Sequence, residues 1–160
     1  MRNPRTLIVD DDPFFRRRLG KPLEQAGHRV WYAANAREGL ELVPFARPDI
    51  IFADQIMPGP SGFDFCERIA ARGAFADSRP MTVVMTGSPD TEDPYCGVRD
   101  GVDLYLSKAD VLEMLAKGSF QPDRLTVDIR RRLAHEPERD TSPDRALYPE
   151  GYLLRSSVSG

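Results

Sequence analysis

The stretch Leu7-Ile8-Val9-Asp10-Asp11 is an apolar run that ends in two carboxylates. Two later stretches end in polar groups too: Asp49-Ile50-Ile51-Phe52-Ala53-Asp54 in one carboxylate, and Asp103-Leu104-Tyr105-Leu106-Ser107-Lys108 in a lysine. If the three are parallel strands of one sheet, their carboxyl ends share an edge, which is where open α/β sheets bind their ligands. The sequence therefore predicts a small acidic pocket with a cation beside it.

Three carboxylates in one pocket need compensation, because two unit charges about 4 Å apart repel by about 4 kcal/mol at an effective dielectric constant near 20. Protonation of one acid, with a raised pKa, is one solution. A divalent cation is the other, and Mg²⁺ binds one or two carboxylates together with waters and phosphate oxygens. Lys108 adds a point charge that suits a phosphate oxygen, and Thr86-Gly87 offers a hydroxyl and an N–H group. Each group alone is as easily a helix cap or a strand residue; their joint occurrence favours a site.

The rest of the chain alternates between strand and helix patterns. The predicted strands are 7–10, 30–34, 49–54, 81–85 and 103–108, and the predicted helices are 13–26, 36–43, 61–71, a weak one at 91–100, and 111–117. Asp12, Asn35 with Glu38, and Asp110 are the expected caps, and a bend is expected at Pro22. Alternation of this kind indicates a doubly wound α/β sheet of parallel strands.

The third predicted helix has Phe63, Cys66, Ile69 and Ala70 as its expected core contacts. A further helix is predicted from Pro122 onward. Cys66 and Cys96 have no metal-type spacing, so they are expected to be free thiols.

Composition argues against several functions. The net charge is -3, and the basic runs 16–18 and 130–132 are short, so neither direct nucleic-acid binding nor an anionic membrane surface is expected. There is no signal peptide and no apolar run long enough to cross a bilayer, and we therefore expect a cytoplasmic protein.

Four blocks of the sequence resemble the signature blocks of two-component response regulator receiver domains. They are Val9-Asp10-Asp11-Asp12, Asp54 with Met57-Pro58-Gly59-Pro60-Ser61-Gly62, Thr86-Gly87, and Gly101-Val102-Asp103-Leu104-Tyr105-Leu106-Ser107-Lys108. Their order and separations fit as well, over roughly residues 5 to 135. The resemblance implies a CheY-like (flavodoxin-like) fold, with a five-stranded parallel sheet of order 2-1-3-4-5 and helices on both faces.

The resemblance also implies roles for single residues. Asp54 is the expected phosphoacceptor, supplied by a sensor histidine kinase or a phosphotransfer protein, and Mg²⁺ is the expected cofactor. Asp11, Asp54 and the Ile56 backbone carbonyl would bind the metal directly and Asp10 mainly through a water. The remaining expected roles belong to three side chains: Lys108 pairs with the phosphoryl oxygens, Thr86 moves to bond the acyl phosphate, and Tyr105 turns inward behind it. This is a two-state switch rather than an enzyme with an external substrate.

The predicted division is a receiver domain at 1–135 and a linker or tail at 136–160, with no recognisable output domain. Output is expected through a downstream protein partner, through a homodimer, or through further segments of a longer chain. The tail either is a linker or docks residues 147–154 on its own domain or on a second copy.

One departure from the family concerns Ala109, which stands where the family has a proline that is generally cis. Either the chain after Lys108 runs differently, or Ala109 follows a non-proline cis bond, which costs about 2.5–4 kcal/mol.

Two other functions compete with phosphoryl acceptance. A phosphohydrolase with an aspartate nucleophile resembles Asp-x-Asp-x-Thr at its first strand, but here Asp10-x-Asp12 is followed by Pro13 and Phe14. A degenerate receiver used as a fixed interaction module would lack site residues, and this sequence has them all.

Overall fold

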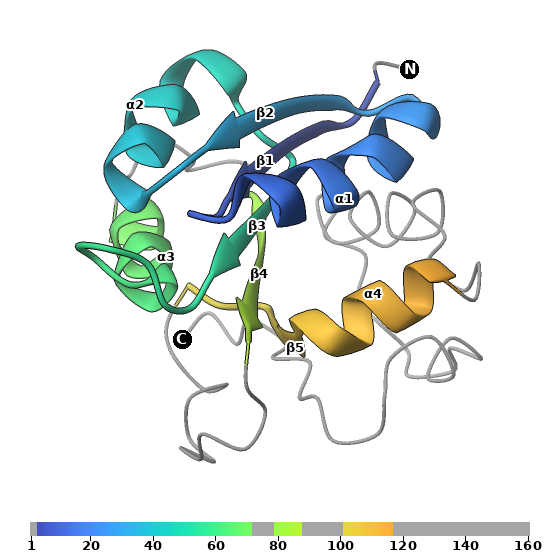
Figure 1. Cartoon of the computed structure of the whole chain (residues 1–160). Helices are drawn as coiled ribbons and strands as arrows, with labels where there is room; N and C mark the ends of the chain where they lie inside the picture. The colour runs from blue at the N-terminus through green and yellow to red at the C-terminus, as the bar shows by residue number, and fades with distance from the viewer. Residues whose placement is uncertain (1–2, 72–78, 88–100, 117–160) are drawn as a thin grey trace, which may run out of the picture.

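A computed structural model describes residues 3–71, 79–87 and 101–116 of the chain (Figure 1). The predicted helices at 91–100 and from Pro122, Cys96, and the tail at 136–160 lie outside the described residues. None of the helices in the described ranges is long and apolar enough to cross a membrane.

The described strands form one parallel sheet of five strands in the order β2-β1-β3-β4-β5, as the sequence predicted. The strands are β1 (Arg5–Val9), β2 (Arg29–Ala33), β3 (Ile50–Asp54), β4 (Met81–Thr86) and β5 (Leu104–Ser107). All residues of β3 and β4 are buried, because helices cover both faces of the sheet at its centre.

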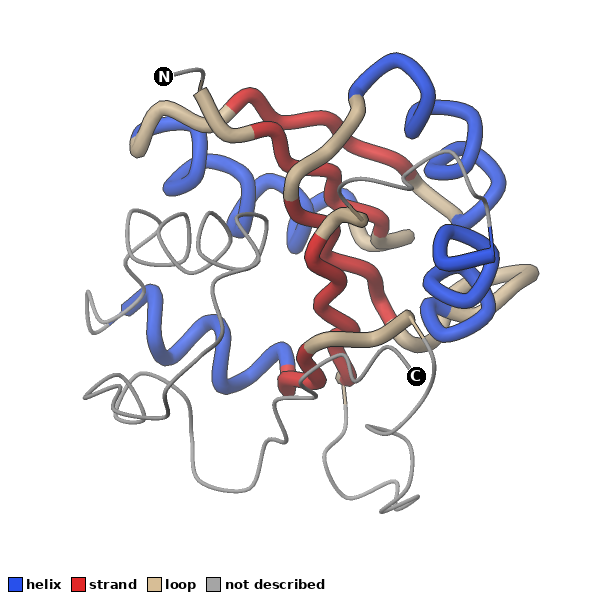
Figure 2. The backbone as a smooth tube through the Cα atoms, turned by 180° about the vertical axis from the view of Figure 1, so that it is seen from behind, coloured by secondary structure: helices blue, strands red, loops and turns tan. Residues whose placement is uncertain are grey.

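The helices in the described ranges cover both faces of the sheet (Figures 1 and 2). The side chains of α1 (Pro13–Gln25) and α4 (Lys108–Ala116) pack in one apolar cluster with Ile8, Phe52 and Leu104. Those of α2 (Ala36–Ala46) and α3 (Gly62–Ala71) pack in a second cluster on the other face. The two clusters are the core of the doubly wound sandwich.

Helix α1 begins and ends much as the sequence predicts. Asp12 caps it, since its Oδ1 accepts a hydrogen bond from the N–H of Phe14 at 2.9 Å. Phe15, Leu19 and Leu23 form its buried face. The segment stays helical through Pro22 as far as Gln25.

Helix α2 has the predicted capping pair, with one difference. Asn35 Oδ1 accepts from the N–H of Glu38 at 2.9 Å, but Glu38 Oε2 accepts from the N–H of Ala34 at 2.8 Å and not from that of Asn35. The pair therefore fixes the turn that leads from β2 into α2.

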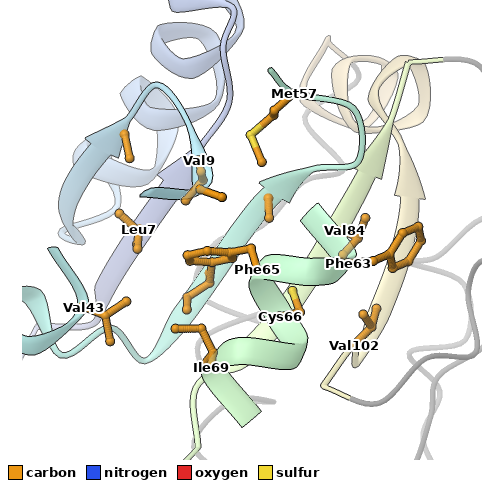
Figure 3. Packing of buried hydrophobic residues seen from close by; sticks show 14 residues of the cluster. Leu7, Val9, Val43, Met57, Phe63, Phe65, Cys66, Ile69, Val84 and Val102 are labelled. Atoms are coloured by element: carbon orange, nitrogen blue, oxygen red, sulfur yellow. The ribbon is translucent and has the colours of Figure 1, made fainter. Parts of the chain in front are cut away.

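Helix α3 buries three of the four residues that were predicted to contact the core. Phe63, Cys66 and Ile69 are buried as predicted, but Ala70 is exposed, and Phe65, which was not predicted, is fully buried. Figure 3 shows the ring of Phe65 among these core side chains. Burying a phenylalanine ring is more favourable than burying an alanine methyl group, so the core includes Phe65 and leaves Ala70 at the surface.

Helix α4 begins three residues earlier than predicted, at Lys108. Ser107 Oγ accepts from the N–H of Asp110 at 2.9 Å, so Ser107 provides the cap and Asp110 lies in the first turn. No peptide bond in the described ranges is cis, so the bond before Ala109 is trans. Of the two alternatives for this segment, the different backbone path is the correct one, because the helix starts where the strand ends.

The start of β5 is fixed to β4 by the buried carboxylate of Asp103. It accepts from the N–H of Thr82 at 2.8 Å and from Arg79 Nη2 at 2.6 Å. Charge-assisted bonds of this length are among the stronger ones in proteins. They hold β5 in register, and with it the position of Lys108.

Candidate functional site

The predicted acidic groups and the lysine meet at the carboxyl edge of the sheet. Asp10 and Asp11 follow β1, Asp54 is the last residue of β3, and Lys108 follows β5 directly. Carboxylate oxygens of the three acids lie within 4.8 Å of one another. Lys108 Nζ lies 2.7 Å from Asp10 Oδ2 and 3.0 Å from Asp54 Oδ2. One ammonium thus bridges two carboxylates that come from different strands.

The three acids differ in burial and in hydrogen bonding. Asp10 is fully buried and Asp54 is 5% exposed, whereas Asp11 is exposed. Asp10 Oδ1 accepts from the N–H of Asp12 at 2.8 Å. Asp10 Oδ2 lies 2.7 Å from the ammonium of Lys108, and among the described residues no other hydrogen-bond donor reaches it. The ammonium that meets this oxygen is shared with Asp54.

The crowding of charge changes the proton affinity of Asp54. Burial, followed by the charge of Asp10, raises the pKa of Asp54 to about 6, against the opposing effect of Lys108. Burial alone would lower the pKa of Lys108, but hydrogen bonds and charges from Asp10 and Asp54 outweigh it and raise that pKa. The lysine therefore stays charged, and its single charge does not fully compensate the acids.

The residues present fit a divalent metal ion. Mg²⁺ prefers hard oxygen ligands, and the cluster offers carboxylate oxygens of Asp10, Asp11 and Asp54. The three acids share the one ammonium of Lys108, so a divalent cation would offset the negative charge that remains. Ile56 follows β3 at the same edge, with its side chain 70% exposed.

Thr86 and Tyr105 also lie where the sequence placed them, on β4 and β5. Thr86 ends β4 and is 1% exposed, opposite Ser107 in the register of the sheet. The hydroxyl of Tyr105 donates to Gln55 Oε1 at 2.8 Å, and its ring stacks on Phe63 with 5.9 Å between the ring centroids. Tyr105 therefore contacts the residue that directly follows Asp54.

Sequence reasoning missed two of these neighbours, Gln55 and Phe15. Gln55 is next to Asp54 in the chain, and that adjacency was the only available signal. Phe15 belongs to the buried face of α1, and its ring centroid lies 4.7 Å from Lys108 Nζ. By contrast, Cys66 takes no part in the site, because burial raises its pKa to about 12 and keeps the thiol protonated.

Residues 6–118 match the family described as Response regulator receiver domain. The chain belongs to this family. Receiver domains of two-component systems accept a phosphoryl group and switch conformation, and the acidic cluster fits that function.

Two curated relatives illustrate the match. The receiver is 36% identical over 156 residues to the transcriptional regulatory protein AfsQ1 of Streptomyces coelicolor, covering 98% of this chain and 62% of that protein. It is 35% identical over 113 residues to protein PilH of Pseudomonas aeruginosa, covering 71% of this chain and 92% of that one. The chain thus spans nearly all of PilH but about three fifths of AfsQ1.

Solved structures agree on the fold. A CheY-like receiver domain protein from Methanospirillum hungatei is 25% identical and superposes with a TM-score of 0.61, over 83% of this chain and 95% of its own. A putative response regulator from Chloroflexus aurantiacus is 26% identical with a TM-score of 0.62, over 83% of this chain and all of its own. The CheY-like fold implied by the signature blocks is confirmed.

Proposed function

We propose that Asp54 is the phosphoacceptor of this receiver domain and that Mg²⁺ is its cofactor. The observation that carries the proposal is the single ammonium of Lys108, which lies within 3.0 Å of both Asp10 and Asp54 at the centre of the acidic cluster. No other described carboxylate combines near-complete burial, a raised pKa and contact with this lysine.

The reaction is a transfer of a phosphoryl group from a phosphohistidine to a carboxylate. An Asp54 oxygen forms a bond to phosphorus while the bond from phosphorus to the imidazole nitrogen breaks, and the histidine leaves with that electron pair. Near pH 7 most Asp54 is ionised, because its pKa is about 6, and the carboxylate is then available as a nucleophile. Catalysis of this kind depends mostly on positioning and on neutralising charge.

Each remaining residue has a role in that reaction. Asp11, Asp54 and the Ile56 carbonyl would hold Mg²⁺ directly and Asp10 mainly through a water; the metal supplies positive charge for the phosphoryl oxygens. Lys108 pairs with one of those oxygens. The hydroxyl of Thr86 donates to the acyl phosphate, and Tyr105 leaves Gln55 and moves inward. Those two movements are the switch.

The partners follow from the same chemistry. A sensor histidine kinase or a phosphotransfer protein donates the phosphoryl group, and a downstream protein partner, a second copy of the receiver or a further segment of the chain receives the signal. AfsQ1 is a transcriptional regulatory protein, so control of transcription is one such output. We place the receiver at 1–135 and a linker at 136–160, in the cytoplasm.

The test is the stoichiometry of phosphorylation by acetyl phosphate with Mg²⁺, measured by intact mass. We expect one phosphoryl group on the natural protein and none on Asp54→Asn. Asp12→Asn is the matched control, because it removes a nearby charge while asparagine still caps α1, and it should be phosphorylated normally. An adduct that persists in Asp54→Asn, or steady hydrolysis of a phosphomonoester, would contradict the proposal.

A further inference from the structure

Among the residues that the structure describes, the ammonium of Lys108 meets two carboxylates and one aromatic ring. The carboxylates are those of Asp10 and Asp54, at 2.7 and 3.0 Å. The ring is that of Phe15, whose centroid lies 4.7 Å from Nζ. Phe15 is on α1 and is 5% exposed, so the contact is shielded from water.

An aromatic face attracts a cation because its quadrupole presents negative charge there. The attraction is significant within about 6 Å and grows when the pair is desolvated. The ring adds to the attraction from the two carboxylates and opposes the unpaired N–H groups at the start of α4, which disfavour a positive side chain.

The ring differs from the two carboxylates in one respect that matters for the reaction. A ring neither takes up a proton nor binds Mg²⁺, whereas Asp10 and Asp54 would turn to the metal and the phosphoryl group. The attraction between Phe15 and the ammonium therefore persists at the moment when the other two contacts loosen.

We propose that Phe15 is a positioning residue for phosphoryl transfer. Its ring holds the Lys108 ammonium beside Asp10 and Asp54, so that the nitrogen contacts a phosphoryl oxygen without first being released to solvent. The proposal deepens the function assigned to Lys108 and rests on it. A purely structural role makes a different prediction, since any apolar side chain of similar size would then serve equally well.

The first test needs neither metal nor phosphate. The folding equilibria of the natural protein, Phe15→Leu, Lys108→Met and the double variant are measured by urea unfolding without Mg²⁺. We expect Phe15→Leu to reduce the folding constant about threefold to thirtyfold more when Lys108 is present than when it is methionine, the range from an exposed to a desolvated cation–π contact. An equal reduction in both backgrounds would overturn the proposal.

The second test varies the electronics of the ring and leaves its shape nearly unchanged. Phenylalanines with one, two and three ring fluorines are placed at position 15, and the rate of phosphorylation by acetyl phosphate is measured. We expect the rate to fall with each fluorine, about threefold to tenfold over the series. The same substitutions at Phe65, which is buried on the opposite face, should leave the rate unchanged.

A rate that does not change across the series at position 15 would overturn the positioning role. The two tests also separate this proposal from the function on which it rests. If the natural protein takes up no phosphoryl group, the function fails, while the unfolding experiment still measures the Phe15–Lys108 coupling.

Discussion

Asp54 carries an electrostatic penalty in the metal-free protein. Its carboxylate is 5% exposed and lies beside Asp10, which is fully buried, and the lysine between them is shared. The raised pKa records that the folded protein holds a proton on Asp54 more tightly than the unfolded chain does. Carboxylates that bind a cation often destabilise the folded protein when the cation is absent, and Asp54 is an example.

This penalty predicts how stability depends on pH without metal. Burial and the charge of Asp10 raise the pKa of Asp54 in the folded protein to about 6, from 3.8 for an unperturbed aspartate. Between these values the folded state keeps a proton that the unfolded state has lost, so the contribution of Asp54 to stability falls as pH rises from about 4 to about 6, and is level above. At 1.36 kcal/mol per pKa unit the loss is on the order of 3 kcal/mol.

Asp54→Asn removes that titration. Without Mg²⁺ at pH 8 we expect the variant to be more stable than the natural protein, and we expect the difference to shrink toward zero near pH 4. Urea unfolding at pH 4, 6 and 8 in the presence of a chelator measures this. If the two proteins shared one pH profile, the burial and charge effects assigned to Asp54 would be wrong.

At the scale of elements, the start of α3 is fitted directly against the end of β3. Gly62 is the first residue of α3, and its N–H donates to the carbonyl of Gln55 at 3.1 Å. A Cβ atom at Gly62 would overlap the backbone carbonyl of Asp54. Backbone atoms cannot turn aside as a flexible side chain can, so only glycine fits between the helix and the acidic residue.

Gly62→Ala should therefore disturb both stability and the site. Relieving the overlap must shift α3 or the end of β3, and overpacking of this kind costs about 1–3 kcal/mol. We expect a lower midpoint of urea unfolding together with slower phosphorylation by acetyl phosphate. Gly87→Ala is the control for stability, because a Cβ at Gly87 meets nothing within 4 Å; an equal loss in both variants would argue against the overlap.

The boundaries of the strands and helices show which parts of the fold could be predicted from the sequence. The ends of β1, β3 and β5 were predictable because each of these runs stops at a charged residue, and Asp10, Asp54 and Lys108 come together for that reason. The start of α4 was not, because Ser107 and Asp110 are both good caps and only the structure shows that Ser107 provides the cap.

Contacts between elements that are distant in the chain were beyond prediction from sequence as well. The ring of Phe15 reaches Lys108, and the hydroxyl of Tyr105 reaches Gln55. Each of these contacts depends on how one element lies against another. No local pattern of residues encodes that placement.

For the molecule as a whole, the strand order explains why the site lies between β1 and β3. The chain passes from β1 to β2 in one direction and from β3 to β4 and β5 in the other, so the order reverses between β1 and β3. Helices α1 and α3, which follow β1 and β3, consequently lie on opposite faces of the sheet (Figure 1). The carboxyl edge at such a reversal is the usual ligand site of open α/β sheets, and there Asp10 follows β1 while Asp54 ends β3.

Because the acidic cluster of Asp10, Asp11 and Asp54 is formed only in the folded molecule, Mg²⁺ should stabilise the whole domain. A ligand that binds only the native state adds RT ln(1 + [L]/Kd), which is about 2.7 kcal/mol at one hundred times the Kd. We expect Mg²⁺ to raise the Tm of the natural protein at pH 8 and to have little effect at pH 4, where protons occupy Asp54. Saturating Mg²⁺ should also abolish the fall in stability between pH 4 and 6, since the metal supplies the charge that the proton otherwise supplies. Thermal unfolding with and without Mg²⁺ measures both effects, and a Tm rise of equal size in Asp54→Asn would place the metal somewhere other than this cluster.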